Sequence, residues 1–336
     1  MSIRNDKIIE WLVNKIKSDY KDDISLLVIY GSYINGTDNQ LSDVDFYFIP
    51  KTERAYDLCK TFIIEGIGFD LFPISWERVE GLAEFNECLT SLLANVKIAY
   101  SNSEEDVNRF NELQEKLKKN LMNIRFMLEK AIDNVDKAMI NYTKMLFKED
   151  ICAIRTLAGQ VLMSLSDSIA YANQTYFSKG LKKQLEDLKH MKKVPTNYLS
   201  LYTSIIKSNS SKNIKRYCYE IIKETAEFLN KQNKYNTREN DFNYEELTAI
   251  YEELVSIWNK IIISCDSDNY QLAYISGVNL QEELNWISLE YGLQTYDLMS
   301  AYNAKNLKYF KSKAIEIQKQ FAGLVEQKNG KIKEYN

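Results

Sequence analysis

The sequence predicts an α+β protein, in which a small mixed-sheet domain precedes a long all-helical region. Only 11 glycines and 3 prolines occur among the 336 residues, about a third of their usual share. So few turn-forming residues cannot punctuate an all-β sandwich or barrel, and long helices account for the composition better. Five of the glycines and two of the prolines fall between residues 31 and 81, so sharp turns are concentrated there.

The first hundred residues alternate between helix and strand patterns. Apolar residues at helical spacing predict an amphipathic helix over 4–19. Short apolar runs flanked by turn residues predict strands over 25–30, 44–49, 69–74 and 96–100. Pro73 has no amide hydrogen, so the third strand either lies at a sheet edge or ends at that residue. Ser75 is a suitable N-cap for a helix that begins at Trp76.

Beyond residue 103 almost every segment carries the 3.6-residue period of a helix. The segments with this period lie near 104–131, 134–147, 150–176, 179–190, 196–208, 212–231, 243–264, 270–291 and 295–326. The polar and unpatterned stretch 231–241 is the best candidate for a linker. We therefore expect a first domain over 1–102, a helical bundle over 103–232 and a C-terminal helical extension over 242–336.

Charge and cysteine usage narrow the function classes. With 43 basic and 47 acidic side chains the net charge is −4, whereas a protein that holds nucleic acid usually carries a basic stripe. The five cysteines are at least 29 residues apart, which suits neither a zinc site nor a disulfide framework. The N-terminus lacks the apolar core of a signal peptide, and no apolar run reaches the ~20 residues of a membrane span. We expect a soluble, cytoplasmic protein that does not bind membranes.

One segment, 29–49, carries more chemistry than the rest of the chain. Its sequence is IYGSYINGTDNQLSDVDFYFI. The first predicted strand ends in Gly31-Ser32, and ten residues later Asp43-Val-Asp45 opens the next strand. Because a strand alternates faces, the two aspartates are expected to project to the same side.

Two carboxylates on one side of a strand repel each other unless a cation lies between them. Asp43 and Asp45 therefore suggest a site for a hard divalent ion such as Mg²⁺, which prefers oxygen ligands and leaves positions for substrate phosphates. Gly31 lets the backbone approach an anion closely, and Ser32 would open a short helix whose first amides point at phosphate. Asp70, in the third predicted strand, could reach the same metal from a neighbouring position.

These residues resemble a known signature. Gly31-Ser32, ten intervening residues, Asp43-x-Asp45 and a later strand acid look like the pattern of the nucleotidyltransferase superfamily, which has the DNA polymerase β-like fold. The amino-acid sequence of this segment is most similar to that of antibiotic nucleotidyltransferases of the lincosamide and kanamycin (aminoglycoside) type. In that group a small α/β domain is followed by a helical domain. The resemblance covers 28–74, and the last ~95 residues look like an extension beyond those compact enzymes.

The resemblance implies a role for each matching residue. Gly31 and Ser32 would hold the β- and γ-phosphates of ATP or another nucleoside triphosphate. Asp43 and Asp45 would ligate two Mg²⁺ ions, and Asp70 would ligate one of them and could take the proton from the attacking hydroxyl. The implied reaction moves a nucleoside monophosphate, most simply AMP, onto a hydroxyl of a small molecule and releases pyrophosphate. An aminoglycoside or a lincosamide is the implied acceptor.

Relatives of this type also supply groups from the helical domain and from a second subunit. The helical domain of these relatives often carries a carboxylate that acts as general base and a lysine that binds the triphosphate. Lys137, Asn141 and Lys144 share one face of a predicted helix, and Lys144 is the candidate for the triphosphate. A homodimer is possible by the same resemblance, because the acceptor site of such enzymes can span two subunits.

Other polar residues have a simpler interpretation. Glu77, Glu80, Glu84 and Glu87 share one helix face, and a solvated face explains them better than a site for a cationic drug. His190 lies in a basic helix end, where cations are favoured for structural reasons.

Three alternatives remain beside the leading hypothesis. The acceptor could be a protein or an RNA, as in toxin–antitoxin nucleotidyltransferases. The chain could also be a non-catalytic module that binds nucleotides, although an idle site has no reason to keep three clustered carboxylates. A nucleic-acid polymerase is the least favoured, since neither a basic groove nor interleaved aromatic and basic residues are found.

Overall fold

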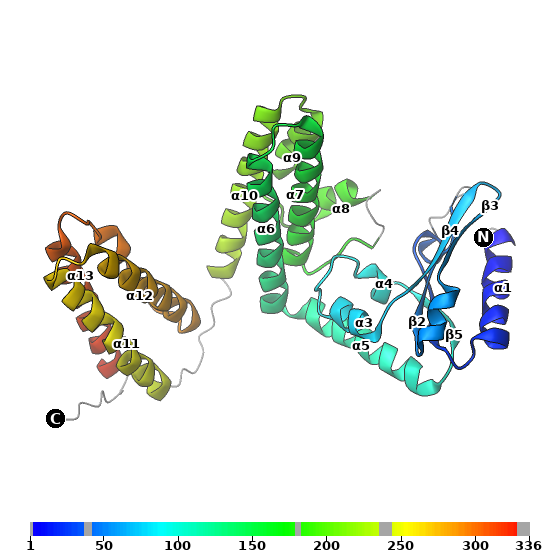
Figure 1. The fold of residues 1–336 in the computed structure, drawn as a ribbon, viewed down its shortest axis with the longest axis horizontal. Helices are drawn as coiled ribbons and strands as arrows, with labels where there is room; N and C mark the ends of the chain where they lie inside the picture. Colours follow the sequence, from blue (N-terminus) through cyan, green and yellow to red (C-terminus); the bar gives the residue numbers. More distant parts are fainter. Residues whose placement is uncertain (1–2, 37–41, 179–182, 235–243, 328–336) are drawn as a thin grey trace. The chain divides into compact units, whose positions relative to one another are not determined.

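The computed structural model describes residues 3–36, 42–178, 183–234 and 244–327. The chain forms two compact units, Met1–Asn233 and Lys234–Asn336. The first unit contains a five-stranded sheet and the helices up to α10, and the second contains the remaining helices (Figure 1). This architecture confirms the predicted α+β class, with a small sheet domain followed by helices.

The sheet has the strand order β3-β4-β2-β1-β5 and is mixed, because β2 and β4 run parallel while the other neighbours are antiparallel. The strands are β1 (Ile24–Tyr30), β2 (Asp45–Pro50), β3 (Lys60–Ile64), β4 (Ile67–Pro73) and β5 (Lys97–Ser101). Each of the four predicted strands is present within two residues of its expected ends.

The edge strand β3 was not predicted. It joins β4 through a tight turn in which Glu65 and Gly66 both have positive φ, 52° and 77°, the conformation of a two-residue hairpin. This strand makes β4 an internal strand. Pro73 was expected either to lie in an edge strand or to end its strand. The second expectation is confirmed, because β4 is internal and ends at Pro73.

The two faces of the sheet pack into different cores. One face packs with helix α1 (Ile3–Asp19), to which the strands contribute Leu27, Ile29, Phe46 and Phe48. The opposite face belongs to one continuous core with helices α3 to α10, to which the strands contribute Leu26, Val28, Tyr47 and Ile49. Side chains alternate along a strand, so Tyr30 and Asp45 project on this second face, toward the helices.

The other helices of the first unit follow in chain order. They are α2 (Ser32–Asn35), the 3₁₀-helix η1 (Glu53–Leu58), α3 (Trp76–Ala83), α4 (Ser91–Ala94), α5 (Glu104–Met122), α6 (Ile124–Leu146), α7 (Ile151–Ala172), α8 (Gln184–His190), α9 (Tyr198–Lys207) and α10 (Ser211–Lys234). Ser75 caps α3 as predicted, since its hydroxyl accepts a hydrogen bond from the Arg78 amide at 3.2 Å. The predicted helix over 104–131 is wrong in its extent, because Asn123 ends α5 and caps α6, accepting from the Phe126 amide at 3.1 Å.

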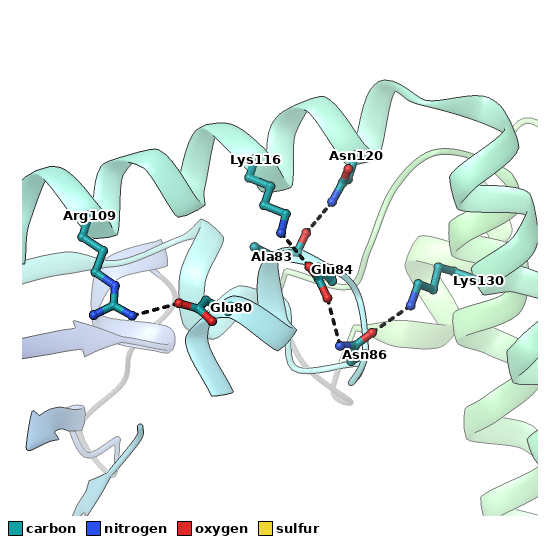
Figure 2. A network of polar contacts seen from close by, with 8 residues as sticks. All are labelled: Glu80, Ala83, Glu84, Asn86, Arg109, Lys116, Asn120 and Lys130. Atoms are coloured by element: carbon teal, nitrogen blue, oxygen red, sulfur yellow. Dashed lines mark hydrogen bonds and ion pairs between the residues drawn. The ribbon is translucent and has the colours of Figure 1, made fainter. Parts of the chain in front are cut away.

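Polar contacts join the sheet domain to α5 and α6 (Figure 2). Glu80 pairs with Arg109 and Glu84 with Lys116, while Asn86 accepts from Lys130 on α6. The predicted helix face of acidic residues is wrong in its extent, because α3 ends at Ala83 and Glu84 and Glu87 lie beyond it. Glu80, Glu84 and Glu87 are half-buried and paired with cations. Half-exposed ion pairs are worth only about 0–1 kcal/mol each, so we attribute the strength of this junction to the shared apolar core and its orientation to the ion pairs.

The second unit is formed by α11 (Tyr244–Asp266), α12 (Tyr270–Glu290), the 3₁₀-helix η2 (Met299–Ala301) and α13 (Leu307–Gln327), with a core of its own. The predicted helix over 295–326 is wrong in its first part, because α13 begins only at Leu307. Gln281 explains the difference. Its amide nitrogen donates to the Tyr296 carbonyl at 2.7 Å and its oxygen accepts from the Leu298 amide at 2.7 Å, which holds this segment as a loop.

None of the described helices is both long and apolar enough to span a membrane.

Candidate active site

Four polar side chains lie in a row across four neighbouring strands of the sheet. Tyr30, the last residue of β1, is paired with Asp45, the first residue of β2. The parallel register of β2 and β4 brings Asp45 beside Asp70, and Asp70 is paired with Thr61 on β3. Because these positions are in register, their side chains share the face that packs against the helices. The sheet therefore brings together two of the predicted site acids from strands 25 residues apart in sequence.

The three predicted acids differ in their surroundings. Asp45 is half-buried and opens β2, and Asp43 is half-buried in the residues that lead into that strand. Asp70 is exposed, and its Oδ1 accepts a hydrogen bond from the Thr61 hydroxyl at 2.9 Å. The threonine thus fixes one oxygen of Asp70 from the edge strand.

Tyr30 lies within electrostatic reach of all three acids. Burial raises the pKa of its phenol, and the negative charges of Asp45, Asp43 and Asp70 raise this pKa further. The ring packs edge-on against Phe72, with 6.3 Å between centroids. The phenol therefore stays protonated at neutral pH, so Tyr30 is a hydrogen-bond donor within electrostatic reach of the three carboxylates.

Gly31 lies directly behind Asp45. Its φ of 80° and ψ of −152° fall in a region that only glycine adopts without strain. A Cβ atom at this position would lie 1.9 Å from the Asp45 Oδ2, so no side chain fits. Ser32 begins α2 as predicted. The helical part of the unit reaches this turn, because the Asn35 side-chain amide donates to the Ser178 carbonyl at 3.2 Å.

A cation from α3 faces the same region. Arg78 makes a bidentate ion pair with Glu87, at 2.7 Å from Nε and 2.9 Å from Nη2. This pairing raises the pKa of the arginine. Its positive charge acts on Tyr30 in the opposite direction to the three acids and lowers the phenol pKa. The acids and Arg78 together place both signs of charge around Tyr30.

The donor set fits a magnesium ion in its chemistry. Asp43, Asp45 and Asp70 offer only carboxylate oxygens, which hard divalent ions prefer, and the Gly31 backbone packs directly against the Asp45 carboxylate. Over the described ranges, however, no group of three or more His, Cys, Asp or Glu side chains is already arranged to hold a metal ion. The metal role of these acids therefore stays a prediction.

A buried carboxylate on α7 adds a further titratable group. Asp167 is only 8% exposed, and burial raises its pKa from 3.8 to about 7 despite the opposing effects of the Cys88 thiol and the Lys137 charge. Cys88 follows Glu87 in the chain, so the segment after α3 touches Arg78 with one residue and Asp167 with the next. Polar side chains thus extend from the sheet to α7.

No hydrogen bond or ion pair among the described residues joins Lys144 to the predicted acids. This lysine is exposed in the last turn of α6 and lies about 21 Å along that helix from Lys130, at 1.5 Å per residue. It makes no hydrogen bond or ion pair with any other described residue. Its predicted role at the triphosphate stays untested, and Lys137 is the α6 lysine that acts on Asp167. His190 lies in the last turn of α8, as expected from its basic surroundings.

Sequence reasoning missed Tyr30, Thr61, Arg78 and Asp167. Tyr30 precedes Gly31 in the motif, and its register opposite Asp45 could have been inferred from the two predicted strands. Thr61 was missed because its strand was not recognised. Asp167 carries no motif, and only the fold brings it to Cys88, 79 residues earlier in the chain.

Comparisons with known proteins find nucleotidyltransferase-related matches. A family model described as the KNTase C-terminal domain matches residues 108–235. A protein of Methanocaldococcus jannaschii, provisionally named as a protein adenylyltransferase, is 30% identical over 104 residues, which are 28% of this chain and 71% of that protein. The crystal structure of a nucleotidyltransferase-like protein from Exiguobacterium sibiricum covers 70% of this chain and 81% of its own at 10% identity and a TM-score of 0.38.

Proposed function

This chain belongs to the nucleotidyltransferase family, and we propose that it transfers AMP from ATP to an acceptor hydroxyl with release of pyrophosphate. The observation that carries the proposal is the row of Tyr30, Asp45 and Asp70 on one sheet face, with Gly31 directly behind Asp45. This arrangement supports the proposal, because the two acids and the glycine belong to the motif by which the sequence resembles the family.

In this proposal Asp43, Asp45 and Asp70 would hold Mg²⁺, which when bound neutralises charge on the phosphates. Gly31 and Ser32 would receive the β- and γ-phosphates. The acceptor oxygen forms a bond to the α-phosphorus while the bond to the leaving pyrophosphate breaks. The proton of the acceptor hydroxyl passes to Asp70, whose Oδ1 is oriented by Thr61.

We propose a small molecule that bears a hydroxyl, an aminoglycoside or a lincosamide, as the first acceptor to test. Two observations support this choice: the KNTase model matches residues 108–235, and the sequence of the motif resembles that of antibiotic nucleotidyltransferases. A protein hydroxyl is the second candidate, and the name of the Methanocaldococcus relative favours it. Incubation with labelled ATP separates the two: label in macromolecules of a lysate supports a protein or RNA acceptor, and label only in small molecules opposes it.

Asp43→Asn and Asp45→Asn test the reaction itself. Each should lower Mg²⁺-dependent pyrophosphate release at least about a hundredfold, which corresponds to about 3 kcal/mol of lost transition-state stabilisation. The assay reads pyrophosphate over a panel of nucleotides, aminoglycosides and lincosamides. Asp57→Asn, a change of an exposed acid on η1, is the matched control and should keep full activity. Full activity in either Asp43→Asn or Asp45→Asn would refute the mechanism.

A further inference from the structure

Helix α12 in the second unit carries apolar residues on two opposite faces. One face, with Ala273, Leu280, Leu284 and Ile287, is buried in the core of that unit. The other face is exposed: Leu272 is 44% exposed, Ile275 57%, Trp286 48% and Leu289 56%. Single exposed apolar residues are ordinary, whereas four on one helix face form an apolar surface of the kind found at interaction sites.

The exposed face has the spacing of a coiled-coil seam. Leu272, Ile275, Asn279, Glu282, Trp286 and Leu289 follow one another at intervals of 3, 4, 3, 4 and 3 residues. This alternation is that of positions a and d in a heptad repeat, which line one stripe of a helix. Asn279 and Glu282 are exposed, and neither makes a hydrogen bond with any other described residue. We call these six residues the α12 stripe.

The order of residues in the α12 stripe is the same read from either end: two apolar, two polar, two apolar. An antiparallel second copy would therefore place Leu272 opposite Leu289 and Ile275 opposite Trp286. At the centre, Asn279 of each copy would face Glu282 of the other, so that two amide groups donate to two carboxylates. A twofold axis requires this kind of self-complementarity, because each residue of one copy meets its counterpart in reverse.

A parallel pairing fits the α12 stripe poorly. It would place Glu282 against Glu282, and like charges in direct contact are unfavourable. The helix contains no lysine or arginine to offset them, since the acidic residues of Tyr270–Glu290 are its sole charged side chains. The pattern of charge on this face thus selects one orientation of one partner.

We propose that the α12 stripe is a homodimer interface, in which α12 of two chains pair antiparallel about an axis between Asn279 and Glu282. The stripe runs from Leu272 to Leu289, which are 17 residue steps apart, or about 26 Å at 1.5 Å per step. An interface of one helix pair is at the small end of specific interfaces, so the dissociation constant should be of micromolar order. The proposal does not depend on the reaction that the first unit performs.

Sedimentation of the full chain over a concentration series tests the dimer. We expect a reversible change from one to two chains with rising concentration. Trp286→Glu places a charge opposite Ile275 and should raise the dissociation constant at least about tenfold, since buried tryptophans are frequent hot spots. Ile263→Glu is the matched control, because Ile263 is 66% exposed on α11 and outside the stripe; it should leave the constant unchanged. A chain that stays monomeric at every concentration, or a dimer that Trp286→Glu does not weaken, overturns the proposal.

Asn279→Lys tests the orientation. In the antiparallel pair each new ammonium group faces Glu282 of the other copy, and the dimer should tighten several-fold. In a parallel pair the two ammonium groups face each other, and the dimer should weaken. The double change Asn279→Lys with Glu282→Lys should dissociate the antiparallel pair. These positions are exposed, so circular dichroism should show unchanged folding; weakening by Asn279→Lys alone would overturn the antiparallel arrangement.

Discussion

Gly31 combines two constraints that no other residue satisfies. Its φ of 80° and ψ of −152° cost a non-glycine residue about 1–3 kcal/mol, and a Cβ would overlap the Asp45 carboxylate. Gly31→Ala should therefore displace Asp45 and lower nucleotidyl transfer at least about a hundredfold. Steady-state assays with ATP and Mg²⁺, together with a urea unfolding curve, measure both effects.

The control for this change is Gly66→Ala in the β3–β4 turn. Gly66 also has a positive φ, 77°, but a Cβ added there would have no other residue's atom within 4 Å beyond its chain neighbours. The variant should lose stability by about 1 kcal/mol and keep its activity. If Gly31→Ala and Gly66→Ala affected catalysis equally, the contact with Asp45 would not be the cause.

Asp167 makes stability depend on pH in an unusual direction. Its pKa is about 7 in the folded protein and 3.8 as an ordinary aspartate, so between these values the folded state binds one proton more than the unfolded state. The free energy of unfolding contributed by this group therefore falls as pH rises from about 4 to 7, by up to about 4 kcal/mol. Asp167→Asn removes this dependence and should be more stable than the unchanged protein at pH 8.

Urea unfolding of both proteins at pH 5 and pH 8 measures the effect. The advantage of Asp167→Asn should be larger at pH 8 than at pH 5. An equal difference at the two pH values would mean that Asp167 does not titrate on folding.

At the scale of elements, the sequence predicted what local chemistry dictates. Gly31 after β1 and Ser75 before α3 were recognised because a glycine turn and an N-cap are local features. The turn at Gly31 marks the end of β1, and the motif that follows it leads into β2. The acids Asp43 and Asp45 could therefore be identified without any structure.

Elements stabilised by distant contacts could not be predicted. The five side chains of the edge strand β3 are all half-exposed or exposed, so the strand has no buried apolar run. For this reason neither β3 nor its residue Thr61 was predicted. The segment before α13 carries a helical period, yet Gln281 donates one hydrogen bond to its backbone and accepts two from it, which holds the segment as a loop. In both cases tertiary contacts outweigh the local pattern.

At the scale of the whole molecule, the cores decide which parts can fold alone. The core that includes Leu26 and Tyr47 of the sheet continues through α3 to α10, so the sheet domain and the helical bundle share it. The core of the second unit contains only residues from 247 onward. The chain should therefore divide near residue 233 and not near residue 102.

A fragment of residues 1–233 should fold and keep the nucleotidyl transfer activity of the full chain, because it retains the acids, Gly31, Asp167 and both cores that surround them. It lacks the α12 stripe and should sediment as a monomer at concentrations where the full chain is a dimer. A fragment of residues 1–102 should fail to fold, since it would expose the sheet face formed by Leu26, Val28, Tyr47 and Ile49 to water at a cost of about 1.5–3 kcal/mol per side chain. Cooperative thermal unfolding, sedimentation and the pyrophosphate assay on both fragments test this division. A soluble, cooperatively folded 1–102 fragment would show that the shared core is not what joins the sheet to the helices.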